Sequence, residues 1–106
     1  MIVEFRTYRL KPGAHEEFVR VMREESLPLL TKYGIDVVDC GSSLVDDDCY
    51  LIRAFESLTA HQEQEDRFYS SDEWLNGPRE AIVSRIESYH TIVLDLPAQA
   101  VHAMRG

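Results

Sequence analysis

Three polar side chains at alternate positions of one predicted strand have the chemistry to hold a small molecule. Residues 2–10 alternate in polarity and are rich in β-branched and aromatic side chains, which predicts a β-strand. Glu4, Arg6 and Tyr8 then share one face of it. The arginine would pair with a carboxylate, and the tyrosine would donate a hydrogen bond. The alternative is a structural ion-pair network in an interface or on an outer surface.

Three further residues are candidates for the same site. Arg53 lies among apolar residues of another predicted strand and needs a partner, either Glu4 or a ligand. His90 opens the last predicted strand, where it would act as a general base or order the corner before the strand. Trp74, in a broken helical segment, would cover a cavity or fill the core. The predicted catalytic residues are therefore His90 and Tyr8, and the predicted ligand-binding residues are Glu4, Arg6, Arg53 and Trp74.

The sequence predicts neither a metal nor a cofactor. His61 and Glu65 are four residues apart on a predicted helix, but two ligands are too few for a metal site and no third is evident. The acidic run at residues 46–48 lacks the glycine and the distal glutamate of a calcium loop. The sequence contains no phosphate-binding loop, dinucleotide fingerprint or nucleophile elbow.

Length and charge narrow the classes of function. The chain has 106 residues, enough for one domain, and a formal net charge of −8 from 19 acidic and 11 basic side chains. Such a charge argues against binding to nucleic acids or anionic membranes. We expect no transmembrane helix and no signal peptide, and two cysteines without such a signal favour a reducing, cytoplasmic setting.

The predicted elements form the order β-α-β-β-α-β. They are a strand at 2–10, a helix at 14–32, strands at 35–44 and 49–56, a helix from Ser57 or Thr59 to Tyr69, a short turn after a capping box at Ser70 and Glu73, a helix at 79–88, a strand at 89–96 and a loose tail at 97–106. Pro28 predicts a kink or break in the first helix, which Gly34 would cap.

A polar turn at residues 45–48 predicts a hairpin between the second and third strands. The expected register places Leu44 opposite Cys49 and Cys40 opposite Arg53. The two cysteines would then lie too far apart for a disulfide, so we predict free thiols.

This order is the α+β, ferredoxin-like arrangement, an antiparallel four-stranded sheet with helices on one face. The other face must then be solvated or covered by a partner. Because the first and last strands carry apolar residues on both faces, we predict a homodimer that packs sheet face against sheet face. Residues 1–96 would form the domain.

Several segments resemble the NIPSNAP family. They are residues 2–13, 68–74, 78–79 and 86–91, and together the resemblance spans residues 2–96. The resemblance implies a dimeric α/β barrel with a cavity in each subunit, between the sheet and the helices or near the barrel wall. The wider superfamily includes cofactor-free monooxygenases, haem-degrading enzymes, lyases and isomerases, but the family itself has no agreed reaction. Asn76 lies beside Trp74, and the first strand has no asparagine, so the haem-degrading residue set is not matched.

Three functions remain open at this point. The first is a homodimeric NIPSNAP-type domain that binds a small molecule. The second is a cofactor-independent monooxygenase or isomerase acting on a hydrophobic carbonyl compound, with His90 or Tyr8 as the acid or base and Arg6 or Arg53 stabilising an enolate. The third is a non-enzymatic module that binds a partner through its acidic second helix, at Glu63, Glu65 and Asp66.

Overall fold

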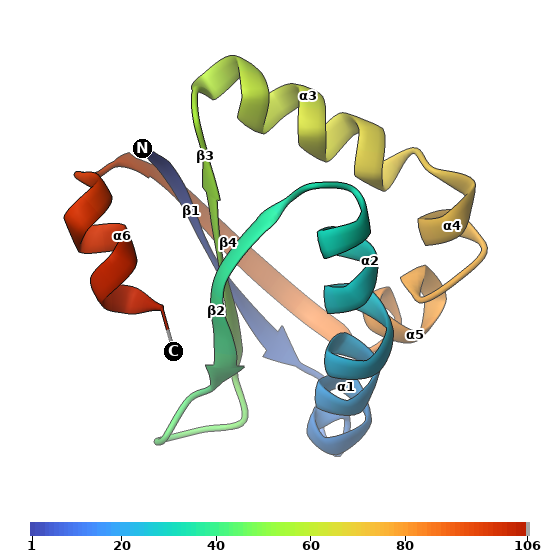
Figure 1. Cartoon of the computed structure of the whole chain (residues 1–106). Helices are drawn as coiled ribbons and strands as arrows, with labels where there is room; N and C mark the ends of the chain where they lie inside the picture. Colours follow the sequence, from blue (N-terminus) through green and yellow to red (C-terminus); the bar gives the residue numbers. More distant parts are fainter. Residues whose placement is uncertain (106) are drawn as a thin grey trace.

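The helices and strands follow the predicted order, with the helical segments divided into shorter pieces (Figure 1). The computed structural model describes residues 1–105. Its elements are β1 (Ile2–Leu10), α1 (His15–Val21), the π-helical turn η1 (Met22–Ser26), α2 (Leu27–Lys32), β2 (Asp36–Ser42), β3 (Cys49–Phe55), α3 (Leu58–Tyr69), α4 (Asp72–Leu75), α5 (Arg79–Val83), β4 (Ile86–Asp95) and α6 (Ala98–Met104).

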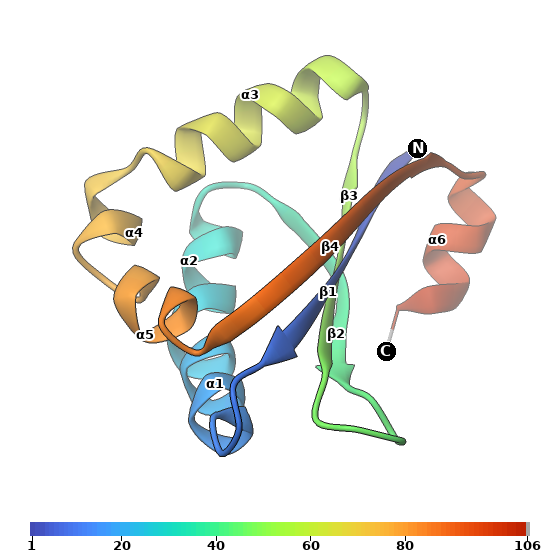
Figure 2. The ribbon, with the colours of Figure 1, turned by 180° about the vertical axis from the view of Figure 1, so that it is seen from behind.

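The four strands form one antiparallel sheet in the order β2-β3-β1-β4, which confirms the predicted α+β, ferredoxin-like fold. Helices α1 to α5 and the η1 turn cover one face of this sheet (Figures 1 and 2). Phe18, Leu51, Phe68 and Ile82 lie in the main core between the two layers. The twisted sheet therefore forms the floor of the region that holds the site, and the helices form its roof.

The predicted break at Pro28 takes the form of a π-helical turn. Proline has no backbone N–H, and its ring would clash with the carbonyl group of Glu24 in a regular helix. In η1 the chain widens by one residue, so that the Leu27 N–H bonds the Met22 carbonyl, and Pro28 falls in the first turn of α2. Gly34, at φ 75°, follows the end of α2 as predicted.

Two serine residues cap the N-termini of helices that cover the site. The Ser57 hydroxyl accepts a hydrogen bond from the Ala60 N–H at 3.0 Å and starts α3. The cap of α4 is Ser71, whose hydroxyl accepts from the Trp74 N–H at 3.2 Å. The predicted capping box at Ser70 is therefore wrong by one residue, because Ser70 is the C-terminal cap of α3.

The last strand begins three residues earlier than predicted. The helix expected at 79–88 ends at Val83, and β4 starts at Ile86, because residues 86–95 pair with β1 along almost its whole length. His90 consequently lies in the middle of the strand instead of at its start.

The register of the β2–β3 hairpin also differs from the prediction. Ser42, and not Leu44, lies opposite Cys49, and Cys40 lies opposite Leu51. The reason is the length of the connection, since the Ser43 N–H bonds the Asp48 carbonyl at 2.8 Å and residues 43–48 form a longer loop. Both cysteines are free thiols, as predicted.

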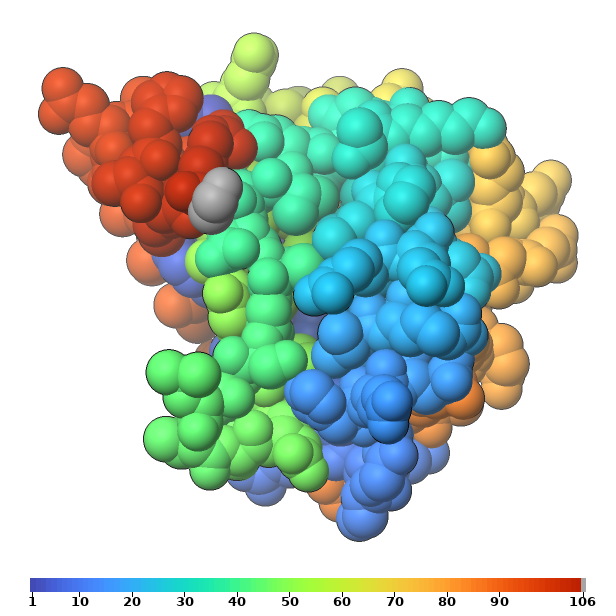
Figure 3. Space-filling view, turned by 60° about the horizontal axis from the view of Figure 1, so that its bottom comes forward, coloured from blue at the N-terminus to red at the C-terminus, as the bar shows by residue number. Residues whose placement is uncertain are grey.

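The C-terminal residues 97–105 are not the loose tail that the sequence predicted. Helix α6 packs on the face opposite α1 to α5, beside β2 (Figure 3). Val101 is fully buried there against Val3, Val38 and Ala54. A bulge in β2 between Val37 and Asp39 turns the Val38 side chain toward α6. Within residues 1–105, no helix is long and apolar enough to cross a membrane.

Candidate functional site

A buried pair of charges joins the two central strands beneath α3. Glu4 lies directly opposite Arg53 in the β1–β3 register, and their side chains are 1% and 0% exposed. The Arg53 Nε–H donates to Glu4 Oε2 at 3.0 Å, and the Arg53 Nη2–H donates to the same oxygen. Of the two partners considered for Arg53, Glu4 is therefore the one that it contacts.

Helix α3 adds two more titratable groups to this pair. The four-residue spacing of His61 and Glu65 places both on the face turned toward the sheet. His61 Nε2 lies 2.9 Å from Glu4 Oε1, and Glu65 Oε2 lies 3.0 Å from Arg53 Nη2. Tyr69, one turn further along, accepts a hydrogen bond from the Arg53 Nη1–H at 2.9 Å. Neither Glu65 nor Tyr69 was predicted from the sequence to belong to the ligand-binding site.

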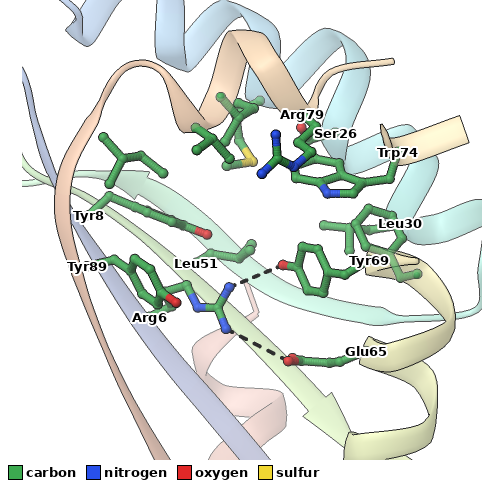
Figure 4. A pocket seen from close by; sticks show the side chains of 15 residues that line it. Arg6, Tyr8, Ser26, Leu30, Leu51, Glu65, Tyr69, Trp74, Arg79 and Tyr89 are labelled. Carbon is green, nitrogen blue, oxygen red and sulfur yellow. Dashed lines mark hydrogen bonds and ion pairs between the residues drawn. The ribbon is translucent and has the colours of Figure 1, made fainter. Parts of the chain in front are cut away.

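Arg6 extends the cluster toward open space. Its Nε–H donates to Thr91 Oγ1 at 3.0 Å, and its Nη1–H donates to the Tyr69 hydroxyl at 3.2 Å. Its guanidinium carbon lies 5.2 Å from the centre of the Tyr89 ring, a cation–π distance. Its Nη2 lies 3.8 Å from Glu65 Oε1 (Figure 4). These contacts fix the guanidinium of Arg6 at the edge of a cavity.

This cavity lies between the sheet and the helices and has a volume of about 340 Å³. Its polar lining includes Arg6, Tyr8, Glu65 and Tyr69 (Figure 4). Most of the remaining lining is apolar and includes Leu30, Leu51, Phe68, Trp74 and Ile82. Pockets of this size and composition are typical sites for small molecules.

The sequence-predicted site residues divide between the two faces of the sheet. Arg6, Tyr8 and Trp74 line the cavity, and Glu4 and Arg53 lie beneath its polar end. His90 lies opposite Thr7 on the other face, so it does not open the strand as predicted and does not line this cavity. The early start of β4 puts His90 in the middle of the strand, and its pairing with Thr7 puts it on the face away from the cavity.

The acidic face expected of α3 is also smaller than the sequence indicated. Glu63 and Asp66 are exposed, but Glu65 turns inward to the charge cluster. A helix that turns some polar residues toward the protein interior has the same polar composition as a helix whose polar residues all face solvent. The four-residue recurrence of His61, Glu65 and Tyr69 is the signal that distinguishes the two.

The two carboxyl groups of the cluster have opposite pKa shifts. Burial would raise the pKa of Glu4, but the hydrogen bond with Glu65, the charges of Arg53 and Arg6 and the bond with His61 together lower it to about 2. Burial and the hydrogen bond with Glu4 raise the pKa of Glu65 to about 8, against the opposing charge of Arg53. At neutral pH one carboxyl group is thus ionised while its neighbour keeps a proton.

The charge that results favours an anion. With Glu4 ionised and Glu65 protonated, the two guanidinium groups of Arg6 and Arg53 leave one net positive charge at the polar end of the cavity. Burial also raises the pKa of Tyr8, so that its phenol stays a hydrogen-bond donor. The arrangement can therefore bind a carboxylate, an enolate or a polarised carbonyl oxygen.

Glu4 is the third possible metal ligand beside His61 and Glu65, which the sequence did not reveal. One donor atom from each residue lies within 4.8 Å of the others. The Arg53 guanidinium already bonds Glu4 and lies against Glu65, however, so that a cation would enter a position next to an existing positive charge. The geometry is that of an ion-pair network.

Comparison with known proteins gives a family match over nearly the whole domain. The profile described as NIPSNAP matches residues 3–97. No curated protein matches the chain.

Solved structures of that family are similar to this chain. An uncharacterized NIPSNAP domain protein from Burkholderia xenovorans is 26% identical, with a TM-score of 0.81 over 92% of this chain and 96% of that one. A NIPSNAP family protein with unknown function from Agrobacterium tumefaciens is 27% identical, with a TM-score of 0.81 over 89% and 86%. A putative antibiotic biosynthesis monooxygenase from Nitrosomonas europaea, at 15% identity and a TM-score of 0.69 over 91% and 98%, shares the fold.

The protonated state of Glu65 predicts an unusual dependence of stability on pH. A carboxyl group whose pKa is raised on folding stabilises the native state fully below its ordinary value of 4.5, and this contribution is lost as pH rises to 8. In the wild type the free energy of unfolding should therefore fall with rising pH, by at most about 1.4 kcal/mol per pH unit and by less where water screens the group. Replacing Glu65 with glutamine should remove this fall. Urea unfolding of both proteins across this range measures the difference.

Glu63→Gln is the matched control, since Glu63 is an exposed glutamate on the same helix. Its free energy of unfolding should follow that of the wild type at every pH. Parallel curves for Glu65→Gln and the wild type would show that Glu65 is ionised in the folded protein.

Proposed function

This chain belongs to the NIPSNAP family, and we propose that it is a homodimer that binds a small organic anion or carbonyl compound in the cavity between its sheet and its helices. The observation that carries this proposal is the guanidinium of Arg6, held at the cavity wall by Thr91, Tyr69 and the Tyr89 ring. A positive group fixed beside an apolar space fits a ligand with an acidic or carbonyl head and an apolar body.

The charge balance around Arg6 supports an anionic head. Glu4 supplies one negative charge for two arginines, because it shares two hydrogen bonds with Arg53 and its Oε1 lies 3.7 Å from Arg6 Nη2. Glu65 carries a proton at neutral pH, so it does not neutralise Arg6. A ligand carboxylate or an enolate oxygen would supply the missing negative charge and would gain a charge-assisted hydrogen bond.

The apolar lining supports the second part of the ligand. Leu30, Leu51, Phe68, Trp74 and Ile82 surround the space beyond Arg6. Burying an apolar body against these side chains contributes about 25 cal/mol per Å² removed from water. A cavity of about 340 Å³ suits a compound of modest size.

Cofactor-independent proton transfer is the second candidate function. The observation that favours it is the carboxyl group of Glu65, which lines the cavity and has a pKa raised to about 8. In its ionised form Glu65 would accept the proton from a carbon next to a carbonyl group. The C–H electron pair would form a new C=C bond to the carbonyl carbon, and the carbonyl π pair would move onto the oxygen, which Arg6 and Tyr8 would stabilise as an enolate. In a β,γ-unsaturated carbonyl compound, return of the proton to the γ carbon would complete an isomerisation that moves the C=C bond into conjugation.

The other face of the sheet supports the proposed homodimer. Phe5 lies between Ile52 and Ile92 in the strand register, and Leu94 lies next to Val3. Ile92 and Leu94 are 46% and 40% exposed, although both belong to a regular strand. A second copy packed on this face would bury them. Helix α6 covers the part that contains Val3, Val38 and Ala54, and Phe5 and Ile52 pack at the edge of that cluster.

A reducing, cytoplasmic setting completes the proposal. Cys40 and Cys49 are free thiols, and burial raises the pKa of both. A raised pKa keeps a thiol protonated and slow to react with oxidants.

Trp74 makes ligand binding directly measurable. It is the one tryptophan in the sequence and it lines the cavity, so its fluorescence reports occupancy. Octanoate should quench or shift this emission, and Arg6→Gln should weaken its binding by about tenfold or more, because a charge-assisted hydrogen bond is lost. Octanol, which has no charge, should bind wild type and variant alike.

Arg9→Gln is the matched control for that experiment. Arg9 lies on the same strand but is exposed on the opposite face, so its loss should leave octanoate affinity unchanged. The proposed function fails if octanoate leaves the emission of Trp74 unchanged, or if Arg6→Gln binds octanoate as well as Arg9→Gln does.

Ile92→Asp should convert the protein from a dimer to a monomer, because it places a charge in the centre of an apolar interface. Sedimentation velocity measures the mass of each form. Leu75→Asp is the control, since Leu75 is also 46% exposed but lies in α4, away from the sheet face. A monomeric wild type, or a dimeric Ile92→Asp, contradicts this interface.

A further inference from the structure

A second polar region lies in the same cavity, on the helix side. Ser26, at the end of the π-helical turn, lines the cavity and is 2% exposed. Its hydroxyl group has no hydrogen-bond partner among residues 1–105. A buried hydroxyl without a partner destabilises a protein, so that one facing a cavity points to a group that arrives from outside.

The Ser26 hydroxyl lies in the π-helical turn and lacks the bond that is usual for a serine in a helix. A serine in a regular helix commonly bonds the carbonyl group four residues earlier. For Ser26 that carbonyl belongs to Met22, which accepts the Leu27 N–H across the widened turn but no bond from the Ser26 hydroxyl. The widening follows from Pro28, and π-helical turns are frequent at functional sites. The Ser26 hydroxyl is therefore available to a ligand.

Arg79 supplies a charge to this second region. It is the first residue of α5, directly after Pro78, and it lines the cavity. Within residues 1–105 its guanidinium group forms no ion pair with a carboxylate. Figure 4 shows Ser26 and Arg79 on the helix side of the cavity, well separated from Arg6 and Glu65, with Leu51 and Tyr69 between them.

We propose that the cavity takes a ligand with two polar ends, and that Ser26 and Arg79 bind the end that lies farther from Arg6. Ser26 would donate its hydroxyl proton, and Arg79 a guanidinium N–H, to an oxygen of the ligand. Two arginines at the two ends favour a ligand with an acceptor or acidic group at each end and an apolar segment between them. This inference rests on the proposed function and narrows its ligand class.

The test compares octanoate with octanedioate, which differ only in the second carboxylate. The fluorescence of Trp74 gives both affinities for the wild type, Ser26→Ala, Arg79→Gln and the control Ser88→Ala. Ser88 is exposed on β4, opposite Arg9. A substitution that disturbs the cavity in general changes both affinities by the same factor, so this effect cancels in their ratio.

The wild type should prefer octanedioate. Ser26→Ala and Arg79→Gln should each lower this preference by about three- to tenfold, the value of one hydrogen bond, while Ser88→Ala leaves it unchanged. Ser26→Ala should also raise the melting temperature of the free protein by about 4 °C, because an unpaired buried hydroxyl is removed.

The outcomes separate the two proposals. If octanoate does not bind, the proposed function fails and this inference fails with it. If octanoate binds but the wild type shows no preference for octanedioate, or both variants keep the full preference, the two-ended ligand is wrong and the proposed function stands. A more stable Ser26→Ala with unchanged preference would show that the serine is only a packing defect.

Discussion

The buried ion pair between Glu4 and Arg53 is the interaction on which the rest of the site depends. Both side chains are almost fully buried, and removing one partner of such a pair costs about 3–5 kcal/mol. The remaining hydrogen-bonding capacity of the pair has to be filled, and α3 supplies His61 and Tyr69 for this purpose. The pair thereby positions α3 over the sheet.

The same pair determines the charge that the cavity presents. Arg53 and Arg6 help to hold Glu4 ionised, and the neighbouring Glu65 keeps its proton because burial disfavours its charged form and its protonated form is held by the hydrogen bond with Glu4. Arg6 is then left with a charge that no side chain fully neutralises, at the edge of an apolar space. Structure and chemistry are linked here, because the groups that join the sheet to α3 also create a site for an anion.

The sequence predicted the strand that carries the site and the extent of α3, but not that α3 turns polar side chains toward the sheet. The alternation of β1 placed Glu4, Arg6 and Tyr8 on one face, and the structure puts that face under the helices. The inward stripe of α3 was missed because buried charged residues and solvated ones have the same composition. The position of His90 was missed because strand pairing with β1 extends β4 toward α5, a long-range effect that local propensity does not contain.

The most direct test of the central claim is a carbon-13 NMR titration of the side-chain carboxyl groups of Glu4 and Glu65, assigned with Glu4→Gln and Glu65→Gln. The carboxyl carbon of Glu4 should titrate at about pH 2, and that of Glu65 near pH 8. If both carbons titrate near 4.5, as in an exposed glutamate, the ion pair does not control the protonation of the site and the anion-binding mechanism is wrong.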